Sequence, residues 1–173
     1  MEILFFDKTS LLKKEKDNLE KKLNVTISIQ GRRIVLEGSP FDEYEASIVL
    51  NAINFGFSIK NALSLKEEDT LFRKLNIKDY TRRKDLRDVR ARIIGKKGKT
   101  KNTIESITGC KTVLKENTLG IIGSAEEIEE ATTALKNLIK GSKQANIYSF
   151  LEKMNRRAPA SDLGLKIKKT MFK

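Results

Sequence analysis

A short stretch near position 96 has residue types and a spacing suited to binding phosphate. Residues 93–100 are Ile-Ile-Gly-Lys-Lys-Gly-Lys-Thr, so two glycines enclose two lysines, and Lys99 and Lys101 follow directly. Glycine lets the backbone turn sharply and come close to a ligand without interference from a Cβ atom. Lysine ammonium groups neutralise phosphate charge. The stretch therefore predicts contact with a phosphate-bearing ligand.

Two kinds of phosphate site fit such a stretch. A Walker loop of a nucleotide-dependent enzyme needs glycine at position 93, which is isoleucine, and must follow a strand, whereas residues 84–93 have a helical pattern. The GxxG clamp that joins two helices of a KH domain, a single-stranded RNA-binding module, needs only the two glycines and the helices. The KH interpretation is favoured. In it, Ile93, Ile94 and Ile104 form an apolar floor for bases, and the helix from Lys99 points its N–H groups at phosphate.

The excess positive charge is concentrated around the same glycines. The chain carries a formal net charge of +12, yet residues 1–75 hold 12 basic and 12 acidic side chains, whereas residues 82–101 hold ten basic and two acidic. A helix over 84–93 would turn its arginines away from an apolar face formed by Leu86, Val89 and Ile93. The candidate RNA-binding residues are Arg83, Arg87, Arg90, Arg92, Ile94, Gly95, Lys96, Lys97, Gly98, Lys99 and Lys101.

The composition argues against most catalytic sites. There is no histidine and a single cysteine, Cys110, which removes the usual metal ligands and the usual general base. We expect no catalytic residue, no metal and no cofactor, and we expect Cys110 to be a small buried residue. No apolar run reaches about 18 residues, so no membrane association is expected and the protein is predicted to be cytoplasmic.

An internal repeat organises the chain. At an offset of 85 residues the matching pairs are Gly38 and Gly123, Ser39 and Ser124, Glu45 and Glu130, Ala46 and Ala131, Leu50 and Leu135, and Gly56 and Gly141. Each copy ends in two strands and a helix; Ser124 with Glu127 forms a capping box, and Ser39-Pro40 is its analogue. The first copy is shorter by about 12 residues, the length of one helix and the glycine loop. The first copy therefore lacks the GxxG loop.

The expected elements follow from these signals. In the first copy they are a strand over 3–6, a helix over 8–23, strands over 25–29 and 34–36, and a helix from 40 to 55. In the second they are a strand over 76–80, helices over 84–93 and 99–108, strands over 111–115 and 119–122, and helices over 125–140 and 144–156. The predicted fold is α+β: two tandem type I KH domains, each with helices on one face of a three-stranded antiparallel sheet. Their predicted bounds are 1–75, degenerate and without GxxG, and 76–157, followed by a basic C-terminal tail over 158–173.

The second copy also resembles a known family. Residues 83–86 and 90–100 are similar to the second KH domain of the archaeal form of the partner-of-Nob family, of the Dim-two type. The similarity continues through residues 108–110, 120–123 and 148–152, and more loosely through 56–58, 62–63 and 163–165. The resemblance covers nearly the whole chain, with its specific motifs in the second half.

The resemblance implies a function as well as a fold. Members of the family are RNA-binding proteins of small ribosomal subunit assembly, not enzymes, and bind the single-stranded 3′ region of small-subunit (pre-)rRNA through the second KH domain. It further implies docking of the Nob-type rRNA-processing endonuclease, association with the alpha subunit of translation initiation factor two, and a first KH domain without GxxG. The alternative from the residues alone is a generic KH protein in RNA decay or translational control.

Overall fold

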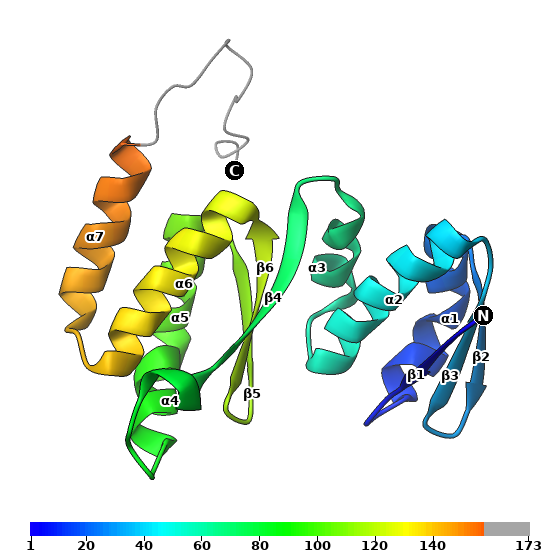
Figure 1. Ribbon diagram of the computed structural model, residues 1–173, viewed down its shortest axis with the longest axis horizontal. Coiled ribbons are helices and arrows are strands. Elements are labelled where there is room, and N and C mark those ends of the chain that lie inside the picture. Colours follow the sequence, from blue (N-terminus) through cyan, green and yellow to red (C-terminus); the bar gives the residue numbers. More distant parts are fainter. Residues whose placement is uncertain (158–173) are drawn as a thin grey trace.

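The structure, a computed structural model, describes residues 1–157. Two α+β units follow one another along the chain, each built around a three-stranded antiparallel sheet. Figure 1 shows the two units side by side, the N-terminal unit in blue to cyan and the C-terminal unit in green to orange. The basic tail predicted over 158–173 lies outside the described residues.

The N-terminal unit spans residues 2–66 and has the sheet order β1-β3-β2. Its elements are β1 (Glu2–Phe5), α1 (Ser10–Leu23), β2 (Thr26–Gln30), β3 (Arg33–Glu37), α2 (Pro40–Phe55), α3 (Ile59–Leu63) and the 3-10 helix η1 (Ser64–Lys66). The predicted start of α2 is confirmed, because the Ser39 hydroxyl accepts a hydrogen bond from the Asp42 N–H and Pro40 occupies the first helical position. Apolar residues of both layers meet in a continuous core that includes Leu12, Leu19, Ile27, Ile34, Leu36 and Leu50.

The C-terminal unit spans residues 70–157 and has the sheet order β4-β6-β5. Its elements are β4 (Thr70–Asn76), the 3-10 helix η2 (Ile77–Tyr80), α4 (Arg87–Ile94), the 3-10 helix η3 (Lys96–Gly98), α5 (Lys99–Thr108), β5 (Lys111–Lys115), β6 (Thr118–Ser124), α6 (Ala125–Lys140) and α7 (Gln144–Arg157). The capping box of α6 is present, with the Glu127 N–H bonded to the Ser124 hydroxyl and the Ser124 N–H to the Glu127 carboxylate. The predicted bounds of α5 and β5 are confirmed.

The strand predicted over residues 76–80 is wrong. The first strand of this unit, β4, occupies residues 70–76 and pairs with β6 along its whole length, while residues 77–80 form η2. The Asn76 side chain accepts a hydrogen bond from the Lys78 N–H, which turns the chain there. The unit boundary predicted between 75 and 76 therefore falls within a strand.

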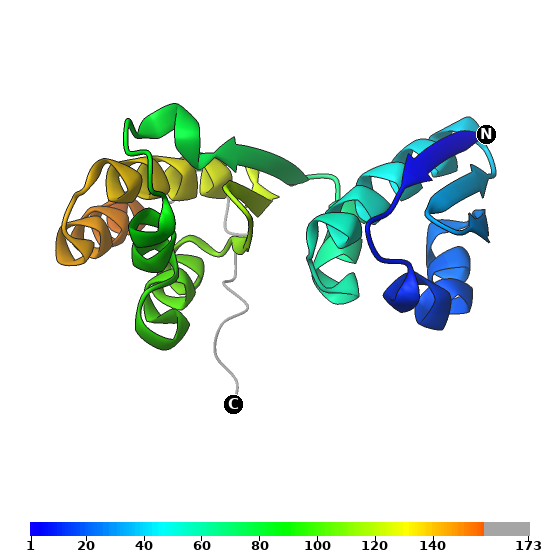
Figure 2. The ribbon, with the colours of Figure 1, turned by 90° about the horizontal axis from the view of Figure 1, so that it is seen from below.

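The second sheet is covered on both faces. Leu75, Leu119 and Ile121 face the helices of their own unit. On the opposite face, Phe72 and Ile122 pack into the core of the N-terminal unit. Figure 2 shows the N-terminal unit on the side of the second sheet away from α4, α5, α6 and α7. The two units thus share one continuous apolar contact.

Aromatic rings form the centre of that contact. Phe57 is 2% exposed, and its ring centroid lies 6.1 Å from that of Phe55 and 5.6 Å from that of Phe72. A Cβ atom on Gly120 would come within 2.6 Å of the Phe55 ring and 2.8 Å of the Phe57 ring, so only glycine fits there. The ammonium of Lys74 on β4 lies 5.6 Å from the centroid of the Phe55 ring, across the contact. These contacts fix the N-terminal unit against the sheet.

A polar bridge closes one edge of the same contact. Lys115 Nζ on β5 donates hydrogen bonds to the Asp7 carboxylate at 2.6 Å and to the Asn54 carbonyl oxygen at 3.2 Å. The hydrogen bond from Lys115, and then its charge, lowers the pKa of Asp7 below its ordinary value. This exposed pair is screened by solvent, so the aromatic contact contributes most of the attachment.

Cys110 lies in the core of the C-terminal unit, as predicted, and is fully buried. Burial raises the pKa of its thiol to about 12 from the ordinary 9.0. The unfolded chain loses the thiol proton above pH 9.0, whereas the native state keeps it up to about pH 12. The free energy of unfolding therefore has its full value below pH 9.0 and declines as the pH rises toward 12.

We expect Ellman's reagent at pH 8 to leave the thiol of Cys110 unmodified in the native protein and to titrate one thiol in 6 M guanidinium. Rapid modification of the native protein would contradict this packing.

None of the helices within residues 1–157 is both long and apolar enough to cross a membrane. In the same range, no group of three or more histidine, cysteine, aspartate or glutamate side chains is arranged to hold a metal ion.

Candidate nucleic-acid interface

The glycine loop connects two helices, as predicted. Helix α4 ends at Ile94, residues 95–98 form a tight turn that includes η3, and α5 begins at Lys99. Gly95 has φ +74°, Lys97 has φ +53° and Gly98 has φ +78°. Three of the four loop residues thus have left-handed φ, which explains why two of the positions are glycine.

Gly95 is required for a second reason. A Cβ atom at this position would lie 2.1 Å from Thr100 Oγ1 and 2.6 Å from the Thr100 backbone nitrogen. The loop backbone therefore packs directly against the first turn of α5. Gly98, by contrast, has open space, since the nearest atom to an added Cβ would be Asn102 Nδ2 at 3.7 Å.

We expect Gly95→Ala to lower the free energy of unfolding by about 2 kcal/mol, because the new methyl group overpacks the loop and φ remains positive. RNA affinity should fall about ten-fold as the loop shifts. Urea denaturation and fluorescence anisotropy with a labelled RNA measure the two effects. Gly98→Ala is the matched control and should cost only about 1 kcal/mol, since it has the positive φ without the clash. Equal losses for the two variants would contradict this account of Gly95.

Three lysines of the loop are free to meet a ligand. Lys96, Lys97 and Lys99 are exposed, and none of them takes part in an ion pair among residues 1–157. They surround the start of α5, where helix N–H groups and the helix dipole also favour an anion. The loop therefore presents cations and a helix N-terminus on one small surface.

Lys101 is placed differently from its neighbours. Its ammonium lies 2.9 Å from Glu105 Oε1, one turn further along α5, and its side chain is only 32% exposed. The same Glu105 oxygen accepts hydrogen bonds from the Thr112 N–H at 2.7 Å and hydroxyl at 2.8 Å. Lys101 is thus tied to the contact between α5 and β5.

Of the three isoleucines predicted to form an apolar floor, one lies on the surface. Ile94 is 40% exposed beside Gly95, where a base can lie against it. Ile93 and Ile104 are 2% and 1% exposed in the core of the unit, so the prediction is wrong for these two. Their positions on α4 and α5 turn them toward the sheet, which the helical pattern of the sequence also indicates.

The predicted arginine face of α4 is shorter than expected. The helix begins at Arg87 instead of residue 84, because the Asp85 carboxylate accepts a hydrogen bond from the Arg87 N–H. Arg83 therefore lies in the loop before the helix, exposed, and its place on the helix face was wrongly predicted. The hydrogen bond from the Arg87 N–H lowers the pKa of Asp85 the most, and the hydrogen bond from the Arg87 guanidinium lowers it further. This ion pair is exposed, so a phosphate can replace the carboxylate at little cost.

The other two arginines contact the protein itself. Arg90, half-buried, has Nη1 3.4 Å from the Asn117 side-chain oxygen in the turn between β5 and β6. Arg92, also half-buried, donates from Nη2 to the Ser142 carbonyl oxygen at 2.7 Å, in the turn between α6 and α7. The structure thus brings Gly95–Lys99 and Ile94 together on the surface, whereas Arg90 and Arg92 join this surface to the rest of the unit.

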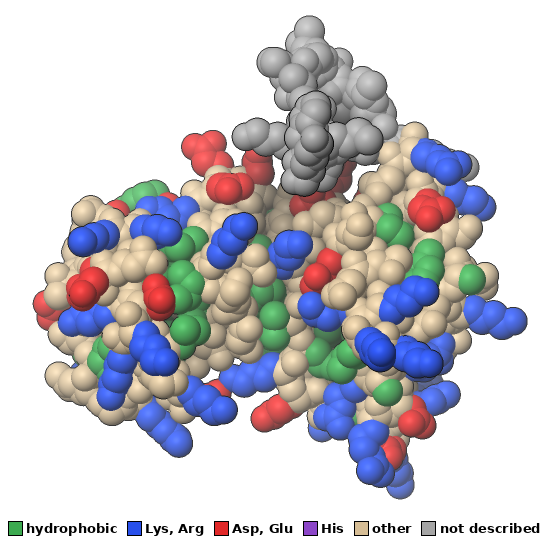
Figure 3. All heavy atoms as spheres, turned by 180° about the vertical axis from the view of Figure 1, so that it is seen from behind, with side chains coloured by type: hydrophobic (Ala, Val, Ile, Leu, Met, Phe, Trp, Pro, Cys, Tyr) green, Lys and Arg blue, Asp and Glu red, His purple; other side chains and the backbone are tan. Residues whose placement is uncertain are grey.

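Seen as a whole, one end of the C-terminal unit is strongly basic. Figure 3 shows lysine and arginine side chains gathered at the lower right, over the end of the unit where α4 and the glycine loop lie. Ten basic residues fall between positions 82 and 101. Such a surface attracts a polyanion over several ångströms and holds it through phosphate contacts.

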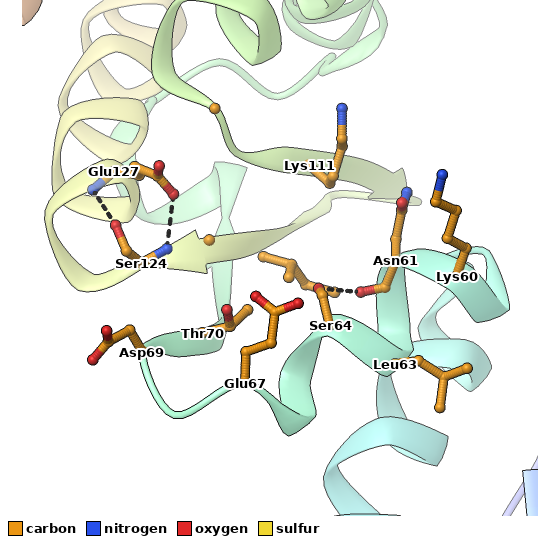
Figure 4. A pocket seen from close by; sticks show the side chains of 13 residues that line it. Lys60, Asn61, Leu63, Ser64, Glu67, Asp69, Thr70, Lys111, Ser124 and Glu127 are labelled. Atoms are coloured by element: carbon orange, nitrogen blue, oxygen red, sulfur yellow. Dashed lines mark hydrogen bonds between the residues drawn. The ribbon is translucent and has the colours of Figure 1, made fainter. Parts of the chain in front are cut away.

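A separate pocket of about 630 Å³ opens between the two units, away from the glycine loop. Figure 4 shows Lys60 and Lys111 on one side of it and the carboxylates of Glu67 and Asp69 on the other. Its lining, which the sequence patterns did not single out, carries both signs of charge. It therefore matches neither a polyanion nor a polycation.

Two residues that matter for the loop carried no recognisable sequence signal. Thr100 is 2% exposed and packs directly against Gly95. Its hydroxyl accepts a hydrogen bond from Gln144 Nε2 at 2.8 Å. A threonine after Gly-Lys suggested only the end of a Walker loop. Gln144 lies 44 positions further along the chain, so no local pattern connects the two.

Comparison with known proteins identifies the C-terminal unit. Residues 71–156 match a family model described as "Eukaryotic type KH-domain (KH-domain type I)", the second KH domain of PNO1 proteins. The match begins within β4 and ends within α7, so it includes the glycine loop and every helix of the unit. The loop between α4 and α5 is thus the GxxG loop of a type I KH domain.

The similarity to curated proteins extends into the N-terminal unit. "KH domain-containing protein MJ0443" of Methanocaldococcus jannaschii is 31% identical over 145 residues, which cover 80% of this chain and 64% of that protein. "RNA-binding protein pno1" of Drosophila melanogaster is 33% identical over 150 residues, covering 82% and 60% of the two chains. The chain thus spans less than two thirds of the length of these relatives.

A solved structure shares the arrangement of both units. Dim2p of Pyrococcus horikoshii OT3, solved in a complex described as a/eIF2alpha-aDim2p-rRNA, is 28% identical, with a TM-score of 0.80 over 90% of this chain and 93% of that one. Sequence model, curated relatives and structure agree on one family. The chain belongs to the PNO1 (Dim2) family of KH-domain proteins.

Proposed function

We propose that this protein binds single-stranded RNA through its GxxG loop. The observation that carries the proposal is the loop geometry: left-handed glycines at both ends, three exposed lysines without ion pairs in the described structure, and the start of α5 directly behind them. Such a loop clamps about four nucleotides of backbone in KH domains. Ile94 supplies an apolar surface for a base, and Arg83 and Arg87 extend the contact to neighbouring phosphates.

The RNA we propose is the 3′ region of small-subunit rRNA and its precursor, during assembly of the small ribosomal subunit. Support comes from the structural relative, whose complex contains rRNA, and from the family to which the chain belongs. The same complex contains a/eIF2alpha, which supports the alpha subunit of initiation factor two as a partner. An rRNA-processing endonuclease of the Nob type is a further proposed partner, resting on the family resemblance.

The two units have different roles in this proposal. Residues 1–69 form a degenerate KH domain that lacks the GxxG loop, and residues 70–157 form the RNA-binding KH domain. In the N-terminal unit the single helix α1 stands where the C-terminal unit has α4, the loop and α5. Residues 1–69 hold 10 basic and 12 acidic side chains and so have no excess positive charge to attract RNA. We therefore assign this unit to protein docking and to support of the second sheet.

The salt dependence of RNA binding tests the phosphate contacts. If about five phosphates are neutralised, the logarithm of the association constant should fall against the logarithm of salt concentration with a slope of roughly −3 to −4. Anisotropy titrations of a labelled single strand from the small-subunit rRNA 3′ end, between 50 and 300 mM KCl, measure it. A slope near zero would contradict the proposal.

Crosslinking followed by sequencing of the bound RNA tests the choice of RNA. We expect reads to be enriched at the 3′ end of small-subunit rRNA and its precursor. Enrichment on messenger RNAs instead would favour the alternative, a generic KH protein in RNA decay or translational control. Thermal stabilisation by ATP with magnesium, which binding at a Walker loop would produce, is not expected.

A further inference from the structure

The GxxG loop is held from the side by the start of α7. Gln144, the first residue of α7, donates from Nε2 to Thr100 Oγ1 at 2.8 Å and lies 3.5 Å from the Arg92 carbonyl oxygen. Thr100 is the residue on which Gly95 rests, and Arg92 is two residues before Ile94. One amide group thus contacts the chain on both sides of the loop.

A second hydrogen bond joins the end of α4 to the turn before α7, and its donor lies on α4. The Arg92 guanidinium, on α4, donates to the Ser142 carbonyl oxygen at 2.7 Å, just before α7 begins. Gly141 lies beside it, since a Cβ atom there would be 3.7 Å from Arg92 Nη1. Two side chains therefore connect the end of α4 to the segment where α7 begins: Arg92 from α4 and Gln144 from α7.

We propose that Gln144 and Arg92 are positioning residues for RNA binding, which set the conformation of the loop 95–98 before RNA arrives. Arg92, predicted from sequence as an RNA contact, acts through the Ser142 carbonyl and not on a phosphate. This inference rests on the proposed function of the GxxG loop. In this proposal α7, the helix that follows the internal repeat, contributes to RNA binding by holding the GxxG loop in place.

The loop needs such support because it stabilises itself weakly. Its own cross-loop hydrogen bond runs from the Gly98 N–H to the Gly95 carbonyl oxygen at 3.1 Å, and three of its residues have positive φ. Glycine-rich segments have many accessible conformations, and the entropy lost on ordering them reduces affinity if the ordering occurs on binding. Holding Thr100 and the Arg92 backbone in place removes much of that loss.

The test is a double-mutant cycle on the intact chain with Gln144→Met and Thr100→Val, which remove the hydrogen bond at nearly constant volume. Each single variant should bind the labelled rRNA strand about five-fold more weakly, as expected for loss of one partly buried hydrogen bond. The double variant should be no weaker than either single one, because both remove the same contact. Amide hydrogen exchange at residues 95–98 should become faster in all three.

Ile147→Val is the matched control. Ile147 is 3% exposed and packs α7 into the core, but its apolar side chain makes no hydrogen bond to the loop. The substitution should lower the melting temperature while leaving RNA affinity unchanged. Arg92→Met should weaken binding without changing the salt slope, whereas loss of a direct phosphate contact would reduce the slope by about 0.7.

The outcomes separate this inference from the proposed function. Wild-type affinity in Gln144→Met, or equal weakening by Gln144→Met and Ile147→Val, would overturn the positioning role while the loop remained the RNA site. A reduced salt slope in Arg92→Met would overturn the role of Arg92. Failure of the proposed function itself would appear as wild-type RNA affinity when Lys96 and Lys97 are reversed in charge.

Discussion

Replacing Lys96 and Lys97 together by aspartate should reduce RNA affinity at least about 100-fold at 100 mM salt, because two phosphate-neutralising cations become two anions. The fold should be unaffected. Both side chains are exposed, and aspartate tolerates the left-handed φ of +53° at position 97 better than most residues. Anisotropy titration and a thermal melt measure the two quantities.

The matched control is Lys13→Asp with Lys14→Asp on α1 of the N-terminal unit. It makes the same change in net charge at two exposed lysines that form no ion pair among residues 1–157. Screening limits a distant charge to a small effect, so we expect at most about a three-fold loss. Similar losses for the two pairs would mean that net charge, not the loop, drives binding.

Phe57→Ala should lower the free energy of unfolding by about 3 to 5 kcal/mol, the usual cost of removing a fully buried phenyl ring. Phe57 lies between Phe55 and Phe72, where the N-terminal unit meets the second sheet. The loss of this ring should also uncouple the units. In urea unfolding followed by circular dichroism, we expect one transition for the wild-type protein and two for the Phe57→Ala variant.

Phe41→Ala on α2 is the control for this substitution. Phe41 is 68% exposed, so its loss should change stability by less than about 0.5 kcal/mol. If Phe57→Ala unfolded at the same urea concentration as Phe41→Ala, the aromatic contact between the units would not be what joins them.

The parts of the fold that local signals encode were predictable. The glycine pair with its flanking helical patterns predicted the loop and the bounds of α5, and the capping box at Ser124 predicted the start of α6. These features depend on residues within about four positions of one another. Strand β4 had a weak signal, because residues 71–75 do not alternate between apolar and polar, and the turn at Asn76 was mistaken for its beginning.

Contacts between distant residues were not predictable from one sequence. Gly120 faces Phe55 and Phe57 across the unit boundary, and Arg92 meets Ser142, 50 positions away. A glycine in a strand or an arginine on a helix fits many environments, so its type does not reveal its partner. Phe57 is buried against the second sheet, and only the packing of the two units shows this.

Amide hydrogen exchange of the full chain, with and without a single strand from the small-subunit rRNA 3′ end, tests whether the GxxG loop is the RNA-binding surface. We expect RNA to protect the amides of residues 87–101, most strongly over Gly95–Lys99, and to leave the amides of residues 1–66 unchanged. Protection confined to the N-terminal unit, or absent from residues 95–99, would contradict this expectation.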